Sequence, residues 1–345
     1  MVSYAPVRST LPVAPDPFTK ITDTMHIVVT IDVEEDGWGN YHESAGTTEN
    51  IRKIPLLQKC FENAGIMPTY LIDYLVATDP YATGLFREIF EDGKCEIGTH
   101  IHPWNTPPFD EERNSRNSML CNLPEELQYR KLKFVHETIK SNLLLEPVSF
   151  RAGRWAFSDT VARNIHRLGY KVDTSVTPYV NWSDIHGPDY SDIAPDPYRQ
   201  DVFDGNGGPE GVLIEIPASI GYLQGRHPLW NKLYKTFKRK HFDKIRMLGI
   251  LGKLNILNKV WLSPEICNLE AMVRLVERFR KDGIPVINLV FHSNSLKHGL
   301  NPFVQGEKDL DTFMGILQDF LGYVKGEGIR SIRLMDILSF PDEIV

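Results

Sequence analysis

The feature of this sequence that most constrains its fold is a regular alternation of short apolar runs with helical patterns. Residues 26–32 (HIVVTID), 67–73 (MPTYLID) and 95–101 (CEIGTHI) form such runs, and each is separated from the next by a helical pattern that ends at a glycine. Apolar runs of this length are typical of strands buried on both faces. Because parallel strands need a crossover connection, this order predicts a parallel α/β sheet.

The alternation extends through the rest of the chain. We expect further strands at 148–151, 170–176, 212–219, 284–292 and 330–337, and helices at 48–65, 80–92, 122–144, 158–168, 265–282 and 308–325. This many strand–helix units imply a sheet that closes or nearly closes on itself, and 345 residues suit one α/β barrel. We therefore predict an N-terminal arm over 1–25 and one barrel domain over 26–345.

The overall composition excludes some classes of protein. A net charge of −7 argues against wholesale binding to nucleic acid, and the four scattered cysteines form no CxxC pair of a structural zinc site. Residues 1–24 lack the apolar core of a signal peptide, and no run approaches the roughly 20 apolar residues of a membrane span. We expect a cytoplasmic protein.

One segment departs from this acidic balance, a predicted insertion at about 220–262. Between Arg226 and Lys259 there are ten Lys or Arg residues and a single acid, Asp243. Basic and apolar residues alternate at helical intervals over 233–251. Such a helix either makes peripheral contact with an anionic membrane surface or packs as a solvated cap on the acidic barrel.

The carboxyl ends of barrel strands carry the chemistry in this class of fold. Five expected strand ends supply Asp32 with Glu34, His100 with His102, Arg151, Asp173 and His292. In each pair the i, i+2 spacing places both side chains on one face. Two imidazoles and a carboxylate suit a catalytic divalent metal, although a polar strand end explains the HxH pair equally well.

The remaining members suggest acid–base chemistry. Asp32 is a candidate general base and His292 a candidate general acid. Asp173 is a candidate partner that keeps His292 charged, and Arg151 a candidate partner of Asp32. The alternatives are an Asx turn for Asp173 and a surface salt bridge for Arg151.

Five segments together resemble the polysaccharide deacetylase family, carbohydrate esterase family four, with its NodB-homology domain. They are VTIDVEED (29–36), EIGTHIHPW (96–104), FRAGRW (150–155), VDTSV (172–176) and LVFHSNSL (289–296). The resemblance implies a distorted barrel of about seven strands, a divalent metal that is usually zinc, and deacetylation of N-acetylated glycans. It also implies Asp32 as base, His100 as the first metal histidine, Arg151 as the residue that orients the base, and His292 as acid.

Two departures mark a divergent branch. Val33 follows Asp32 where a second aspartate is common, so Glu34 must serve as the metal carboxylate. Trp104 stands where a second metal histidine is common, and His102 is the nearby substitute. The resemblance therefore leads to Glu34, His100 and His102 as the expected ligand set for one zinc ion.

Residues beside these motifs are candidates for substrate binding. Trp38, Trp104 and Trp155 can stack on sugar rings, and Arg154 can meet a uronate or phosphate, although ordinary loop packing and solvation explain them as well. The expected function is removal of an acetyl group from an N-acetylated glycan or sugar. The alternatives are hydrolysis of a non-sugar amide or ureide, and a non-catalytic glycan- or lipid-binding protein that has lost its metal.

Overall fold

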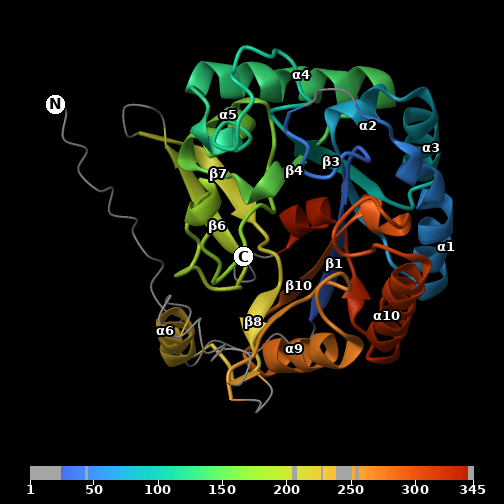
Figure 1. Cartoon of the computed structure of the whole chain (residues 1–345), viewed down its shortest axis with the longest axis vertical. Helices are drawn as coiled ribbons and strands as arrows, with labels where there is room; N and C mark the ends of the chain where they lie inside the picture. Colours follow the sequence, from blue (N-terminus) through green and yellow to red (C-terminus); the bar gives the residue numbers. More distant parts are fainter. Residues whose placement is uncertain are drawn as a thin grey trace.

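The structure is a computed structural model that describes residues 25–42, 46–203, 208–226, 228–237, 251–252 and 256–340. The predicted arm up to residue 24 and residues 238–250 of the basic insertion lie outside the described residues. The described chain is a curled, mostly parallel sheet surrounded by helices (Figure 1), which confirms the predicted distorted α/β barrel.

The sheet contains seven consecutive parallel strands in the order β10-β1-β2-β3-β4-β5-β7. They are β1 (His26–Val33), β2 (Thr69–Ile72), β3 (Glu96–Ile101), β4 (Ser149–Ala152), β5 (Val172–Asp173), β7 (Pro209–Glu215) and β10 (Val286–His292). An antiparallel strand that the sequence did not predict, β6 (Tyr198–Phe203), pairs with β7 at one edge, and the short β11 (Arg330–Ser331) pairs with β1.

The helices lie on the outside of the sheet (Figure 1). They are α1 (Ile54–Ala64), α2 (Tyr74–Thr78), α3 (Pro80–Glu91), α4 (Glu125–Leu143), α5 (Asp159–Arg167), α9 (Leu269–Lys281) and α10 (Glu307–Gly326). Their ends follow local signals: α1 ends at Gly65, whose φ of 74° suits glycine, and the Ser158 side chain caps α5. Helix α4 begins at Glu125 rather than at the predicted 122, because Pro124 occupies its N-cap.

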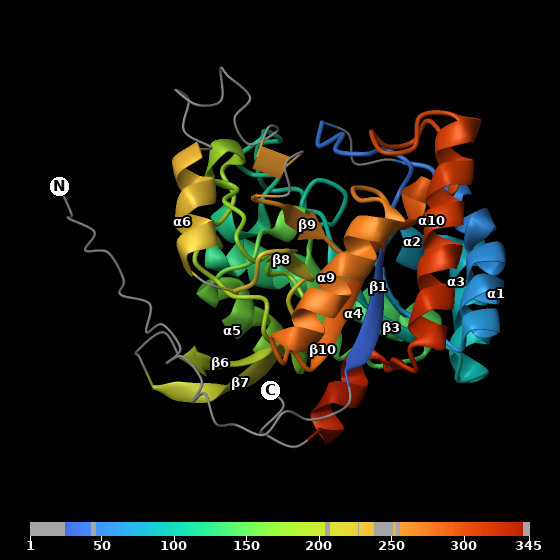
Figure 2. The ribbon, with the colours of Figure 1, turned by 90° about the horizontal axis from the view of Figure 1, so that it is seen from below.

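The basic insertion begins and ends in a small separate sheet. Strands β8 (Ile220–Tyr222) and β9 (Lys259–Trp261) pair antiparallel, and α6 (Pro228–Phe237) follows β8. In Figure 2, α6 lies at the left of the molecule, and β8 and β9 lie nearer its centre, between α6 and α9 in this view. No described helix is long and apolar enough to cross a membrane.

The pleat of β1 separates the outer core from the barrel interior. Ile27, Val29, Ile31 and Val33 belong to the apolar cluster that packs under the helices. Val28 belongs instead to a second cluster, with Leu334 and Ile337 of a 3₁₀ helix at Leu334–Ser339. Side chains alternate along a strand, so Thr30 and Asp32 share the interior face of Val28. The interior of the barrel therefore changes along β1 from apolar to polar.

Polar contacts bridge the interior where strands end early. The predicted strand 170–176 is reduced to β5, and 330–337 to β11 followed by the 3₁₀ helix. Asn288 of β10 accepts a hydrogen bond from the Thr30 hydroxyl at 2.8 Å and donates one to the Thr174 hydroxyl at 2.8 Å. These contacts join β10 and β1 to the segment after β5, across the region where the sheet does not continue.

Candidate metal and catalytic site

The three side chains predicted to bind metal converge at the carboxyl ends of β1 and β3. The Glu34 Oε2 atom lies 2.5 Å from His102 Nε2 and 3.7 Å from His100 Nε2, and the two Nε2 atoms are 3.1 Å apart. All three residues are buried. Burial opposes ionisation of Glu34, but hydrogen bonds from His100 and His102 lower the pKa of this carboxyl below its usual value.

This donor set fits a divalent metal. Tetrahedral ligands at zinc–ligand distances of about 2.0–2.2 Å stand roughly 3.3–3.6 Å from one another. The distances of 2.5, 3.1 and 3.7 Å between the three ligand atoms span that spacing. Two imidazole nitrogens that face each other at 3.1 Å can share only one proton, or can both point their lone pairs at a cation. Three protein ligands leave a fourth position for water or substrate.

The candidate base Asp32 is held by Arg151. The Arg151 Nη1 atom donates to Asp32 Oδ1 at 2.6 Å, and both side chains are buried. Arg151 also donates to the Thr174 carbonyl oxygen at 2.9 Å and to the Thr30 hydroxyl at 2.6 Å, which fixes the guanidinium. Burial opposes ionisation of Asp32, but Arg151, with further help from the nearby histidines, lowers the pKa of this carboxyl. The surface salt bridge considered for Arg151 is thus excluded.

The candidate acid His292 is paired with Glu265, a residue that the sequence analysis missed. The His292 Nδ1 atom lies 3.0 Å from Glu265 Oε2, and the His292 backbone N–H donates to Glu265 Oε1 at 3.0 Å. Burial disfavours the charged imidazole, but Glu265, and more weakly Glu34 and Asp32, raise the pKa of His292 to about 9. The signal for Glu265 is an acid three residues after the apolar run VWL at 260–262.

The prediction that Asp173 keeps His292 charged is wrong. Asp173 lies opposite Glu215 in the pairing of β5 with β7, and it accepts hydrogen bonds from the backbone N–H and hydroxyl of Ser175. This is the Asx-turn alternative. Burial raises the pKa of both carboxyls, and Glu215 rises well above its usual value with Asp173 beside it. The two carboxyls thus influence each other and both feel the charge of Arg151, whereas His292 is paired with Glu265.

The sequence predicts that Trp104 stacks on a substrate sugar. In the structure it does not line the substrate side of the site. Its side chain is only 3% exposed, and its ring stacks on the His102 imidazole at 4.1 Å between centroids. The indole N–H donates to Glu35 Oε1 at 3.1 Å. The residue is buried behind the metal ligands, so an incoming sugar cannot reach its face.

The other three predicted substrate residues are partly buried and lie around the site. Trp38 makes an edge contact with the His292 ring at 4.6 Å, and Trp155 lies under the Arg151 guanidinium at 5.0 Å. Arg154 donates to the Ser118 hydroxyl at 2.5 Å and lies over the Tyr41 ring at 5.9 Å. Arg154 and Trp155 both have left-handed backbone, with φ of 56° and 61°, a strained turn for two non-glycine residues.

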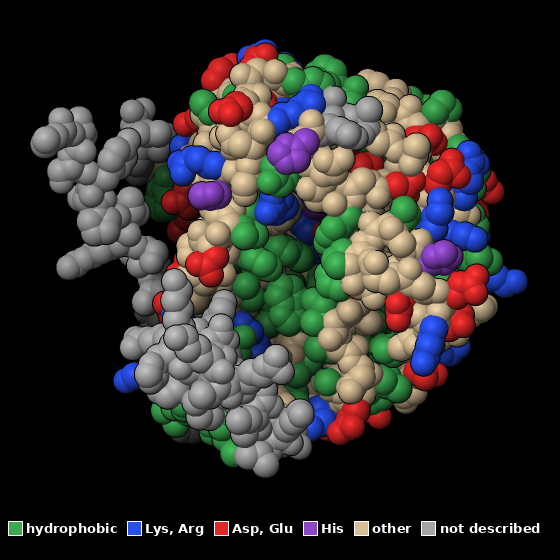
Figure 3. Space-filling view, in the orientation of Figure 1, with side chains coloured by type: hydrophobic (Ala, Val, Ile, Leu, Met, Phe, Trp, Pro, Cys, Tyr) green, Lys and Arg blue, Asp and Glu red, His purple; other side chains and the backbone are tan. Residues whose placement is uncertain are grey.

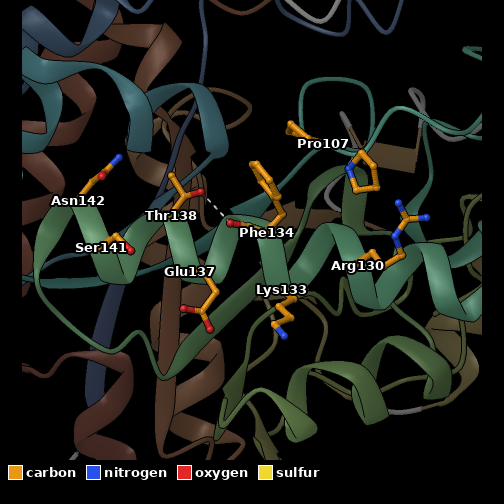
Figure 4. Close-up of a pocket in the computed structure, with 9 residues that line it drawn as sticks. Pro107, Arg130, Lys133, Phe134, Glu137, Thr138, Ser141 and Asn142 are labelled. Carbon is orange, nitrogen blue, oxygen red and sulfur yellow. Dashed lines mark hydrogen bonds between the residues drawn. The ribbon is translucent and has the colours of Figure 1, made fainter.

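The molecule is hollowed near the middle of the face seen in Figure 3, where hydrophobic side chains gather. Among the described residues, Trp155, Trp182 and Trp261 are partly buried and pack on one apolar cluster. A second concavity of about 660 Å³ lies elsewhere, along α4 (Figure 4). It is lined by Pro107, Pro108, Arg130, Lys133, Phe134, Glu137, Thr138, Ser141 and Asn142, none of which is a predicted site residue.

Comparisons with solved structures show which fold this is. The chain is similar to a protein from Mycobacterium smegmatis assigned as a polysaccharide deacetylase, with a TM-score of 0.55 and 14% identity over 95% of this chain and 93% of that one. It is equally similar, at 0.55 and 10% identity, to a protein from Parabacteroides distasonis assigned as a glycoside hydrolase/deacetylase, covering 92% of this chain and 70% of that one.

The fold also occurs in a 4-α-glucanotransferase from Thermococcus litoralis, at a TM-score of 0.52 and 12% identity over 92% of this chain and 41% of that chain. No protein-family model matches the sequence, and no curated protein matches it. The chain thus shares its fold with a polysaccharide deacetylase, as the sequence resemblance implied, and the fold alone does not determine its chemistry.

Proposed function

We propose that this chain is a divergent polysaccharide deacetylase, a metal-dependent hydrolase that removes an acetyl group from an N-acetylated glycan or sugar. One observation carries the proposal. The candidate base Asp32 and the candidate acid His292 approach to 3.7 Å, and Asp32 also lies 4.0 Å from His100 of the metal triad. A proton acceptor, a proton donor and a metal site thus meet at the strand ends, where barrel enzymes place their chemistry.

Glu34, His100 and His102 would hold the metal, with zinc the expected ion. A bound divalent cation supplies Lewis-acid polarisation of the scissile carbonyl. Asp32 accepts a proton from the water that attacks the carbonyl carbon, and Arg151 keeps its carboxylate ionised and oriented.

His292 completes the reaction by protonating the leaving nitrogen as the C–N bond breaks, so that acetate and a free amine result. Its raised pKa keeps the imidazole charged near neutral pH, which a general acid requires. Glu265 is bonded to Nδ1 and leaves Nε2 directed at the reacting groups, because Nε2 is the atom that lies 3.7 Å from Asp32.

The walls of the site support a sugar as the substrate. Trp38 beside His292, and Trp155 beside Arg151, offer aromatic faces of the kind that stack on pyranose rings. Within the described residues the Arg154 guanidinium contacts a hydroxyl and an aromatic ring but no carboxylate. We propose that it meets an acidic substituent of the sugar.

A binding-only protein that has lost its metal is disfavoured by the convergence of three ligand atoms, which such a protein would not need to retain. Hydrolysis of a non-sugar amide or ureide remains the competing activity. A screen for acetate release from N-acetylated mono- and oligosaccharides, run beside a screen for ammonia release from ureides, separates the two. Turnover of ureides alone would overturn the sugar assignment.

A further inference from the structure

The contacts of the His102 ring suggest a function for the tryptophan that replaces the usual second metal histidine. We propose that Trp104 and Gly153 form a clamp that fixes the His102 imidazole in the orientation needed for metal binding. We call these two residues the His102 clamp. The inference rests on the proposed function only in requiring that Glu34, His100 and His102 bind a metal.

The usual device for orienting a metal-binding histidine is missing here. Such a histidine normally donates its second ring N–H to a carboxylate, a carbonyl or water, which fixes the ring and its tautomer. Among the described residues, the buried Nδ1 atom of His102 has no hydrogen-bond partner. The ring therefore has to be held by packing.

One side of the clamp is the Trp104 indole. It is nearly parallel to the imidazole, with an interplanar angle of 26° and a centroid distance of 4.1 Å. The indole is anchored in turn, because its N–H donates to Glu35 Oε1 and the Asn105 amide donates to Glu35 Oε2 at 2.8 Å. The Asn105 amide also donates to Asp73 at 2.9 Å, so the support reaches the end of β2.

The second member of the clamp is the backbone at Gly153, directly after β4. A Cβ atom at this position would stand 2.3 Å from His102 Nδ1 and 2.6 Å from its Cε1 atom. Those distances are far below van der Waals contact, so only glycine lets the backbone approach the ring this closely. The approach also excludes a partner side chain from the Nδ1 edge of the ring.

Rotation of the ring about its Cβ–Cγ bond would carry Nε2 away from Glu34 and from His100. The indole packed on one face of the ring, and the Gly153 backbone close to Nδ1 and Cε1, oppose that rotation at little entropic cost, because the groups that hold the ring are already buried. An indole offers only an N–H donor and cannot itself bind a metal. At position 104, tryptophan thus replaces a residue that would bind the metal with one that supports the neighbouring ligand, His102.

The test is the zinc affinity of the purified chain, measured by competition with a chromophoric chelator. Trp104→Leu removes the flat face, and the expected loss of affinity is about 10–100-fold, as for other residues that support metal ligands. Trp104→Phe keeps a flat ring and should restore most of the affinity. Trp230→Leu alters a partly buried tryptophan of a separate apolar cluster and should leave zinc affinity unchanged.

Gly153→Ala tests the other side and should also weaken zinc binding. The added methyl group would meet the Ile101 carbonyl oxygen at 2.4 Å, so circular dichroism must first establish that this variant folds. If it does not fold, the Trp104 series decides. Wild-type affinity in a folded but less stable Trp104→Leu variant would overturn the clamp and leave the proposed function intact. Absence of zinc binding in the wild-type chain would overturn both.

Discussion

The Nε2 atom of His292 lies 3.7 Å from the Oδ2 atom of Asp32, and each side chain is held from behind by a different partner. Arg151 donates to the other carboxylate oxygen of Asp32, and Glu265 is bonded to the other ring nitrogen of His292. The partners have opposite charges. They therefore keep Asp32 deprotonated and His292 protonated over the same pH range, as a base and an acid in one reaction must be.

Substitution of Asp32 by Asn should lower kcat by about 10²–10⁴-fold, the usual contribution of a general base. The amide keeps the shape of the side chain and loses only the proton acceptor. Zinc content should stay at the wild-type level, because Asp32 is not among the three convergent ligands. Parallel measurement of kcat and zinc content checks this. An active Asp32→Asn enzyme would contradict the assignment of the base.

The pH dependence of kcat/KM should have a basic limb near pH 9, the raised pKa of His292. A general acid works only while protonated, so activity falls as pH rises through this value. Glu265→Gln removes the carboxylate that raises the pKa and should move the limb to lower pH. Glu270→Gln, at a residue whose side chain is 80% exposed on α9, is the matched control. An unmoved limb in Glu265→Gln would argue against the pairing.

Arg151→Met should lower the free energy of unfolding by about 3–5 kcal/mol, because it leaves the buried Asp32 carboxylate without its cation. Arg130→Met breaks a pair of similar length, 2.7 Å, whose side chains are about half exposed, and should cost about 0–1 kcal/mol. Urea unfolding of both variants makes the comparison. Equal losses would show that burial adds nothing to the Arg151–Asp32 pair.

Most of the fold could be predicted from the sequence, and so could the convergence of six residues in the site. These are Asp32, Glu34, His100, His102, Arg151 and His292. Side chains alternate between the two faces of a strand, which places Asp32 on the interior face of β1. Parallel pairing brings the carboxyl ends of β1, β3, β4 and β10 to one edge of the sheet. No knowledge of loop conformation was needed. Residues at strand ends are positioned by the sheet itself.

The errors concern contacts between segments that local sequence patterns do not specify. Glu265 follows β9, a short strand of the insertion marked only by the three-residue apolar run at 260–262, and this run does not indicate that the strand lies beside His292. Asp173 and His292 both stand at strand ends, which favours a contact between them, yet β5 pairs with β7 and brings Glu215 to Asp173 instead. Trp104 was expected to face substrate, and only the tertiary structure reveals its contact with His102.

Arg154→Gln should reduce kcat/KM for acidic sugars by about 10–100-fold, the range expected for loss of a hydrogen bond to a charged group. N-acetylmuramic acid and N-acetylglucosamine 6-phosphate probe a carboxylate and a phosphate, and N-acetylglucosamine is the neutral control. The neutral sugar should be turned over equally by both enzymes. A uniform loss on all three would instead indicate that Arg154 only joins the loops of Ser118 and Tyr41.

The most direct test of the account is the rate of acetate release from an N-acetylated saccharide by chelator-treated protein as zinc is added back. We predict that release is absent without metal and rises to a plateau at one equivalent of zinc. In His100→Ala, which lacks one of the three convergent ligands, we predict no such rise at this zinc level. Acetate release that is unaffected by chelation, or restored equally in His100→Ala, would contradict the proposed metal site and the mechanism built on it.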